Sequence, residues 1–313
     1  MPIYLPVAEI SVNGGMIIAL GALVGFLSGV FGVGGGFMTT PFLIFMGIPP
    51  AVAVGTQANQ LVASSVSGVL SHWRRGNVDP KIGLVMLAGG MIGTLIGIVI
   101  FKLLQVLGQI DLVISLLYVI LLGVIGGLML WESTRAVLTR LLSASQEGGG
   151  KASGARHKMA EWAIWDRLPY KMRFPRSRLY VSALLPGGIG LIGGILVSIL
   201  GIGGGFVMVP MMIYFLGMPT LLVAGTSLFQ ITFTTAFSAL LHATANQTVD
   251  VILALLLIIG SVIGVQAGAA ASRHLRGETA RFLLALMVFA VALRLAFGLV
   301  AEPEALYTLE VMP

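Results

Sequence analysis

Two short segments of the chain combine glycine, phenylalanine and proline in an order that could expose backbone N–H groups within apolar surroundings. Residues 32–41 read Gly-Val-Gly-Gly-Gly-Phe-Met-Thr-Thr-Pro, and residues 201–210 read Gly-Ile-Gly-Gly-Gly-Phe-Val-Met-Val-Pro. A glycine run that opens a helix leaves the first N–H groups free, and these carry roughly half a positive charge that favours anions. The alternative interpretation is a tight turn between packed helices. Because the segment occurs twice, we favour an anion site built from both copies. Its predicted residues are Gly34, Gly35, Gly36, Phe37, Gly203, Gly204, Gly205 and Phe206.

A second pair of matching segments carries hydroxyl and amide side chains. Residues 55–60 read Gly-Thr-Gln-Ala-Asn-Gln, and residues 225–230 read Gly-Thr-Ser-Leu-Phe-Gln. The Thr and the last Gln of each segment are four residues apart, so they share one face of a helix. Such side chains are costly in a membrane unless they bond across helices or line a cavity. They are therefore either hydrogen-bond donors to substrate oxygens or links between helices. The candidates are Thr56, Gln57, Asn59, Gln60, Thr226, Ser227 and Gln230, and Asn59 has no polar counterpart because position 229 is Phe.

The composition places these segments in a membrane protein. Hydrophobic residues make up 57% of the 313 residues and charged residues only 10%, whereas a soluble domain carries about a quarter charged residues. Cysteine is absent, which excludes thiol chemistry and disulfides. The sequence contains no HExxH, GxSxG or P-loop motif and no metal-ligand spacing. We therefore expect no catalytic residue, no metal site and no cofactor.

The apolar runs predict the helices that position the polar segments. A helix needs about 20 residues to cross a bilayer core, and the runs at 37–48 and 206–217 are too short. Both directly follow a glycine motif, so we interpret each as a half-helix joined to its predecessor by a bent glycine loop. The predicted fold is an all-α polytopic membrane protein with two inverted-topology repeats of about five helical segments each. The remaining runs lie at about 16–31, 52–71, 82–101, 112–131, 179–200, 220–241, 251–271 and 280–300.

The internal repeat extends beyond the motifs. Small residues spaced four apart lie on one helix face, where two backbones can approach closely. The chain then divides into an N-terminal transmembrane repeat at 14–131, a basic linker at 132–178, a C-terminal transmembrane repeat at 179–300 and an acidic tail at 301–313. The matching small residues are Gly21, Gly25 and Gly29 with Gly190, Gly194 and Ser198, and Gly89, Gly93 and Gly97 with Gly260, Gly264 and Gly268.

The distribution of basic residues predicts the orientation. Ten of the 18 Lys and Arg residues lie within residues 132–178, so the positive charge belongs to this loop and does not indicate a nucleic-acid surface. If the N-terminus is outside, sixteen of the eighteen fall on the inner side, as the positive-inside rule requires. Because each half has five segments, the second half enters the membrane from the opposite side, and the duplication is an inverted repeat. We expect both termini outside and the loop in the cytoplasm, where it is either solvated or in contact with anionic lipid.

Few ionisable residues fall near the predicted spans. Asp79 and Asp250 match each other, and we expect them to cap the helices that follow. His72 and His242 also match at helix ends, where we expect interfacial side chains, with proton shuttling as the alternative. Arg294 lies near the end of the last span, and we expect it to extend to the interface, with a role as counter-charge for an anion as the alternative.

Together, the doubled glycine motif, the Gly-Thr pair followed one turn later by Gln, and the basic central linker resemble the TauE/SafE family of sulfite and organosulfonate exporters and permeases. The resemblance covers nearly the whole chain outside the linker and tail. It implies a bacterial or archaeal inner-membrane transporter of small sulfur-containing anions such as sulfite, sulfoacetate or other sulfonates. By position, it assigns the substrate site to the two glycine motifs with Pro41 and Pro210, and to the Thr and Gln pairs.

The residues themselves agree with that implication. A sulfite or sulfonate has several oxygens around one small charge, which suits N–H groups from two helix starts together with Thr and Gln donors. One repeat would rock against the other around a single point near the bilayer midplane. An anion channel, a transporter of another small carboxylate or inorganic anion, and a membrane scaffold that uses the linker to bind lipid or a cytoplasmic partner are the alternatives.

Overall fold

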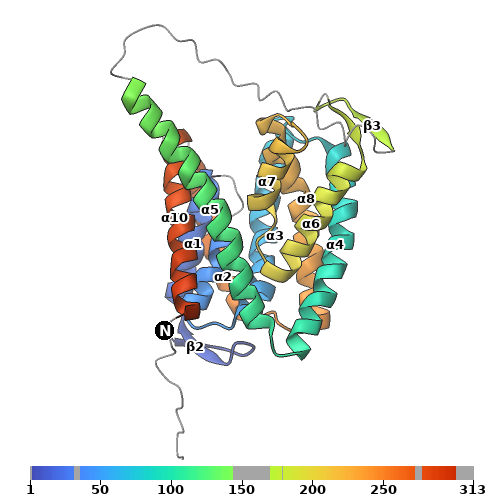
Figure 1. Cartoon of the computed structure of the whole chain (residues 1–313). Helices are drawn as coiled ribbons and strands as arrows, with labels where there is room; N and C mark the ends of the chain where they lie inside the picture. Colours follow the sequence, from blue (N-terminus) through green and yellow to red (C-terminus); the bar gives the residue numbers. More distant parts are fainter. Residues whose placement is uncertain (1, 32–35, 144–169, 178, 272–276, 301–313) are drawn as a thin grey trace, which may run out of the picture.

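The chain forms a bundle of helices with a short β-hairpin at each end (Figure 1). The computed structural model describes residues 2–31, 36–143, 170–177, 179–271 and 277–300. Five helices within these ranges are long and apolar enough to cross a membrane. The prediction of an all-α polytopic membrane protein is therefore confirmed. In the first half the helices are α1 (Gly14–Phe31), α2 (Gly36–Phe45), α3 (Pro50–Arg74), α4 (Pro80–Val106) and α5 (Ile110–Ser143).

The second half follows the same order of long and short helices. The ten-residue helices α2 and α7 confirm the predicted half-helices, and each begins at the last glycine of its motif. The helices of this half are α6 (Leu184–Leu200), α7 (Gly205–Tyr214), α8 (Thr220–Leu241) with the π-helical segment η2 (His242–Asn246), α9 (Val251–Ala271) and α10 (Gly277–Val300).

The second glycine loop explains why its motif is rich in glycine. Gly201, Gly203 and Gly204 have φ angles of 68°, 71° and 69°, a backbone region that L-residues with a side chain rarely adopt. This conformation ends α6 and turns the chain directly into α7. The matching residues 32–35, which include Gly34 and Gly35, lie outside the described residues.

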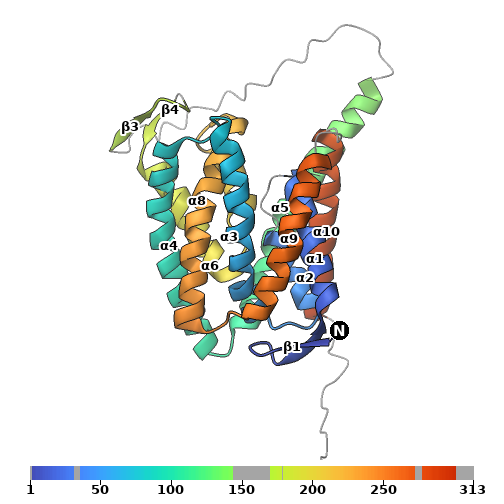
Figure 2. The same cartoon turned by 180° about the vertical axis from the view of Figure 1, so that it is seen from behind.

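The two halves interlock through glycine-lined helix pairs. Helix α1 packs along α9, and α4 packs along α6, while α3 contacts α8 and α5 contacts α10 (Figures 1 and 2). A Cβ atom added to Gly264 would lie 2.1 Å from the carbonyl oxygen of Ala22, and one added to Gly93 would lie 2.0 Å from that of Leu191. The predicted close approach along the small-residue faces is thus confirmed. Each of these pairs joins a helix of one half to a helix of the other.

The predicted linker at 132–178 contains regular structure at both ends. Helix α5 continues to Ser143, because residues 132–143 contain no Gly or Pro and polar residues alone do not end a helix. At the other end, β3 (Lys171–Phe174) pairs with β4 (Leu179–Ser182) across the expected boundary at residue 179. The middle of the linker lies outside the described residues.

The two β-hairpins are a feature that the apolar runs did not predict. Strand β1 (Pro2–Leu5) pairs with β2 (Ile10–Asn13) ahead of α1, and the β3–β4 hairpin stands ahead of α6. Pro6 and Pro175 each follow the first strand of a hairpin. The hairpins lie at opposite ends of the bundle (Figures 1 and 2), so each half begins with the same element at a different end.

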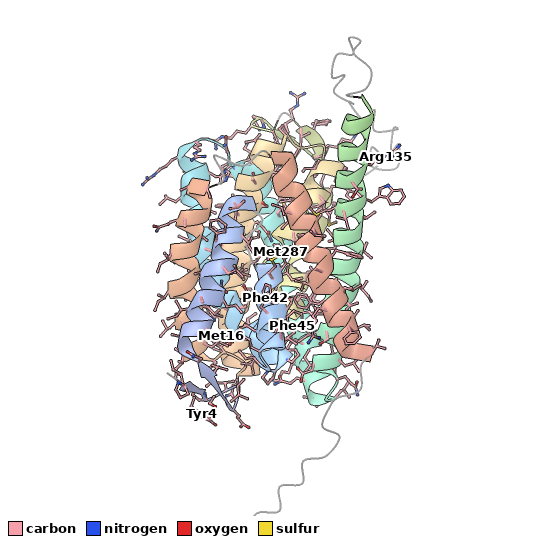
Figure 3. The ribbon with its side chains drawn as sticks, turned by 90° about the vertical axis from the view of Figure 1, so that its left-hand side faces the viewer. Tyr4, Met16, Phe42, Phe45, Arg135 and Met287 are labelled. Carbon is pink, nitrogen blue, oxygen red and sulfur yellow. The ribbon has the colours of Figure 1, made fainter. Side chains whose placement is uncertain are left out.

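The outer surface of the bundle is apolar, as a membrane protein requires. Tyr4 and Met16 project outward with 61% and 60% of their surfaces exposed (Figure 3). Inside, Phe42 of α2 and Met287 of α10 pack against the same core cluster. The half-helix α2 therefore packs against the core cluster through partly buried side chains.

Candidate functional site

The starts of the two half-helices meet in the centre of the protein. Phe37, the second residue of α2, stacks on Phe206, the second residue of α7, with 4.7 Å between ring centroids and 15° between ring planes. Both rings are 3% exposed and belong to one hydrophobic cluster. The structure therefore brings together one predicted site residue from each glycine motif.

Gln57 fixes the first of these helix starts. Its Nε2 donates to the carbonyl oxygen of Gly36, and its Oε1 accepts from the hydroxyl of Thr40. The side chain is fully buried. Gln57 is thus a brace between α3 and α2, and both ends of its amide are already bonded within the protein.

Gln60 lines a small pocket beside the start of α2. The pocket has a volume of about 10 Å³, which is room for about one water molecule. Gln60 is 4% exposed, and its Oε1 has no hydrogen-bond partner among the described residues. The first turn of α2 and serine side chains from three helices line the same pocket as Gln60. Its lining consists of Val24, Gly25, Ser28, Gly36, Gln60, Leu61, Ser64, Ser261 and Val265.

Gln230, the counterpart of Gln60, lies in a different and tighter environment. It is fully buried, and neither its Oε1 nor its Nε2 has a partner among the described residues. The Nε2 atom lies 2.6 Å from the position that a Cβ on Gly90 of α4 would take, and the carbonyl oxygen of Gly190 on α6 lies 3.4 Å from that position. Gln60 thus faces α1, α2 and α9, whereas Gln230 faces α4 and α6.

The two threonines of the repeated Gly-Thr pairs hold loops in place. Thr56 Oγ1 accepts from the backbone N–H of Asp250 at 2.9 Å, and Thr226 Oγ1 accepts from that of Asp79 at 3.0 Å. Gly55 allows the first contact, because a Cβ there would lie 2.4 Å from the hydroxyl oxygen of Thr248. Both hydroxyls thus accept a hydrogen bond that links a helix to a loop, and their role as donors to a substrate stays a prediction.

The aspartates in these contacts confirm the predicted caps and extend them. Asp79 Oδ1 accepts from the N–H groups of Lys81 and Ile82 at the start of α4, while its Oδ2 accepts from the N–H of Ser177 at 3.1 Å and from its hydroxyl at 2.6 Å. Asp79 thereby joins α4 to the turn of the β3–β4 hairpin.

Asp250 forms the equivalent junction at the other end of the bundle. It accepts from the N–H of Leu253 in α9 at 3.1 Å and from the N–H of Val7 in the β1–β2 hairpin at 3.0 Å. Sequence reasoning missed both junctions because it did not predict the hairpins. The available signal was the prolines at 6 and 175, which are separated by the same 169 positions as the glycine motifs.

Two further predicted residues are bonded within their own helices. Asn59 Nδ2 donates to the carbonyl oxygen of Thr56 at 3.4 Å, and the hydroxyl of Ser227 donates to that of Ala224 at 3.1 Å. Neither bond points to a ligand. Gly203, Gly204 and Gly205 are buried in the loop and first turn of α7, next to the stacked Phe206.

The expected interfacial position of His242 is wrong, because its side chain is fully buried. Its Nε2 donates to the carbonyl oxygen of Ser198 at 2.9 Å, and its Nδ1 accepts from Asn246 at 3.1 Å. The sequence predicted that the helix ends at His242, but the π-helical segment η2 continues to Asn246. His72 is half-buried.

Arg294 on α10 is exposed, and its guanidinium carbon lies 5.4 Å from the ring centroid of Phe45 at the end of α2. This is a cation–π contact.

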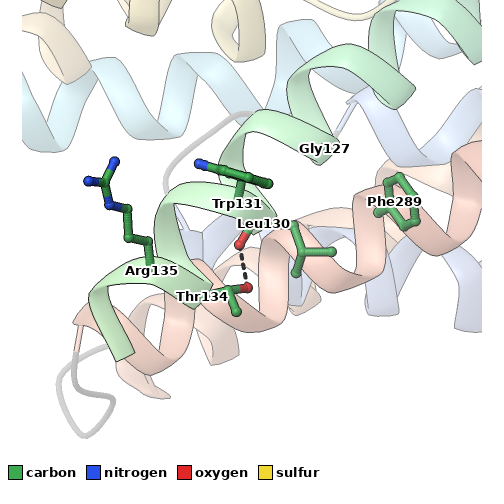
Figure 4. Close-up of a pocket in the computed structure, with 6 residues that line it drawn as sticks. All are labelled: Gly127, Leu130, Trp131, Thr134, Arg135 and Phe289. Atoms are coloured by element: carbon green, nitrogen blue, oxygen red, sulfur yellow. Dashed lines mark hydrogen bonds between the residues drawn. The ribbon is translucent and has the colours of Figure 1, made fainter. Parts of the chain in front are cut away.

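A larger cavity lies away from all of these residues. It has a volume of about 530 Å³ and lies where α5 meets α10 (Figure 4). Its lining is mainly apolar, and the hydroxyl of Thr134 donates to the carbonyl oxygen of Leu130 at 2.6 Å. Arg135 is the charged side chain among its described lining residues, beside Trp131 and Phe289. In the part of the chain that the structure describes, no group of three His, Asp or Glu side chains could hold a metal ion.

The comparisons with known proteins agree with this arrangement. A family model described as "Sulfite exporter TauE/SafE" matches residues 17–295, which include both glycine motifs and both polar segments. The chain belongs to the TauE/SafE family. No solved structure matches it.

Curated relatives of this TauE/SafE protein are described as probable membrane transporters. The Bacillus subtilis protein YjnA is 27% identical over 89% of this chain and 98% of its own length, and B. subtilis YunE is 26% identical over 90% and 97%. A protein of Xylella fastidiosa is 27% identical over 88% of this chain and 92% of its own length. These matches, with the five candidate spans, identify a multi-pass membrane transporter.

Proposed function

We propose that this TauE/SafE protein is a secondary transporter of small sulfur-containing anions, sulfite or organosulfonates such as sulfoacetate, and not an enzyme. The observation that carries the proposal is the pair of matching glutamines. Oε1 of Gln60, and both Oε1 and Nε2 of Gln230, are buried without a partner among the described residues. Each unsatisfied buried group costs about 1–3 kcal/mol. An oxyanion accepts hydrogen bonds only from the Nε2 end of an amide, so at Gln60 the amide would turn to present that end. A transported anion bonded in this way would explain why both halves carry a glutamine.

The chemistry of the surroundings favours a small oxyanion. Gly36 at the start of α2 lies in the same pocket as Gln60, so a helix N-terminus and an amide would both face the ligand. The lining also carries the hydroxyls of Ser28, Ser64 and Ser261. Those of Ser64 and Ser261 donate to carbonyl oxygens of their own helices and would have to turn to bond to a ligand oxygen. Among the described residues that line the pocket there is no Lys or Arg, so the ligand would be held weakly enough to leave.

The helix pairs that join the two halves support a mechanism in which one repeat moves against the other. Since α1 packs on α9 of the other half and α4 packs on α6, a movement of one half changes the packing around both glutamines. We infer an inverted repeat with both termini outside and the basic loop in the cytoplasm, as the positive-inside rule predicts. Alternating access then follows the scheme common to repeat-built transporters.

Flux through purified protein in liposomes tests the proposal. We expect saturable uptake of radiolabelled sulfite or sulfoacetate in the wild-type protein and a large loss of flux in Gln60→Leu. Gln105→Leu is the matched control, because it makes the same change at an exposed position near the end of α4. Flux of acetate but of no sulfur anion would overturn the substrate class, and single-channel currents would identify a channel instead.

A further inference from the structure

The matching glutamines belong to two separate polar tracks, one on α3 and one on α8. On α8 and η2 the side chains recur every four residues along one face, and all six are buried. On α3 the same spacing joins Thr56, Gln60, Ser64, Gly68 and His72. The residues of the α8 track are Thr226, Gln230, Thr234, Ser238, His242 and Asn246.

An apolar contact separates the two tracks. The side chains of Leu61 on α3 and Ile231 on α8 approach Gly203 together, at 3.0 and 3.6 Å from its added Cβ, and Leu228 lies 3.0 Å from that of Gly68. These residues stand between α3 and α8, which pack on each other. The side chains of Gln60 and Gln230 therefore project to different groups of helices and do not share a pocket.

The α8 track has the character of a closed binding site. The hydroxyl of Ser238 lacks a partner among the described residues, as do both ends of the Gln230 amide. Thr94, one turn beyond Gly90 on α4, also has a buried hydroxyl without a described partner. Three unpartnered polar side chains on one helix interface are expensive in a membrane protein, unless the interface opens to a polar ligand during the working cycle.

The α3 track is already partly open. Gln60 and Ser64 line the small pocket with Gly36, and Ser64 and His72 are half-buried. The same sequence pattern thus forms a pocket in one half and a closed interface in the other.

We propose that the transporter has two separate anion-binding positions, one at Gln60 on the α3 track and one at Gln230 on the α8 track, and no single site shared by the two halves. The ligand at both positions is a small oxyanion that accepts hydrogen bonds from the amide Nε2 and from neighbouring hydroxyls. At Gln60, whose unpartnered atom is Oε1, the amide would turn so that Nε2 faces the ligand. This inference rests on the proposed function, because it divides that function between two positions. It replaces the common midplane point expected from the sequence.

Equilibrium binding of radiolabelled sulfoacetate to the purified full-length protein distinguishes the two arrangements. We expect two bound molecules per wild-type chain, one in Gln60→Leu, one in Gln230→Leu and none in the double variant. One molecule per wild-type chain, with binding abolished by either single change, would mean one shared site and overturn the inference while leaving transport intact. If the wild-type protein neither binds nor transports sulfoacetate or sulfite, the proposed function fails and the inference fails with it.

Cysteine protection gives a second readout that does not depend on stoichiometry. The natural chain has no cysteine, so Ser64→Cys and Thr234→Cys place a single thiol on each track at matching positions. We expect sulfoacetate to slow labelling of Ser64→Cys even in the Gln230→Leu background, and of Thr234→Cys even in the Gln60→Leu background. Loss of protection at both thiols in these backgrounds would contradict two independent positions. Ser11→Cys on the exposed face of β2 is the control, and its labelling should not respond to the anion.

Discussion

The first half, on α3, and the second half, on α8, place the same Thr and Gln pair in different surroundings, and the residue opposite the glutamine differs between them. Gln60 faces Ser261 of α9, whereas Gln230 presses on Gly90 at the matching position of α4. A repeated motif therefore specifies the element, while the residues opposite it decide whether a pocket remains.

The largest expected effect concerns the two aspartate junctions. Asp79→Ala removes four hydrogen bonds at one end of the bundle, and we expect it to lower the free energy of unfolding by about 3–5 kcal/mol. Asp250→Ala removes two and should cost less. Thermal unfolding in detergent measures both. Equal losses would mean that the two additional hydrogen bonds of Asp79 add nothing to the stability of its junction.

The glycine-lined helix pairs come next. Gly93→Ala would place a methyl group 2.0 Å from a backbone oxygen of α6, and the forced separation should cost about 2 kcal/mol. Gly264→Ala tests the matching α1–α9 pair and should cost a similar amount. Gly123→Ala on α5 is the control, since nothing lies within 4 Å of its added Cβ, and it should stabilise slightly. A neutral Gly93→Ala would show that the α4–α6 pair is not tightly packed.

Ser177 sharpens the comparison between the junctions, because its counterpart in the first hairpin is Ala8. Ser177→Ala removes the hydroxyl that donates to Asp79 at 2.6 Å and should lower stability by about 1.5 kcal/mol. In the Asp79→Ala background the same change should cost almost nothing, since the acceptor is gone. An undiminished cost there would place the hydroxyl's contribution elsewhere.

The smallest expected change in stability is also the most diagnostic for function. Gln230→Leu replaces an unsatisfied amide by an apolar side chain of similar size, and we expect a gain of about 1 kcal/mol together with a loss of sulfoacetate flux. Gln60→Leu should lose flux with a smaller change in stability, because its surroundings are less tightly packed. Destabilisation by Gln230→Leu, measured by thermal unfolding, would mean that the amide has a partner in the resting protein.

Much of the fold follows from local chemistry. The short apolar runs after the glycine motifs predicted α2 and α7. The four-residue spacing of glycines predicted the close helix pairs. Asp79 and Asp250 were recognised as caps because a cap depends only on neighbouring residues. The hairpins were missed because their four-residue strands are held by contacts to Asp79 and Asp250 that are distant in sequence. The role of Gln57 was missed for the same reason, since its partners lie on another helix.

Stability of the purified protein against a panel of small anions tests the central claim, that paired glutamines bind a sulfur oxyanion, most directly. A ligand at a hundred times its dissociation constant stabilises by about 2.7 kcal/mol. We predict a shift with sulfite or sulfoacetate, none with acetate, retention of the shift in Gln105→Leu, and its loss in the Gln60→Leu, Gln230→Leu double variant. A sulfite or sulfoacetate shift of unchanged size in the double variant, or no shift with any sulfur anion, would contradict the claim.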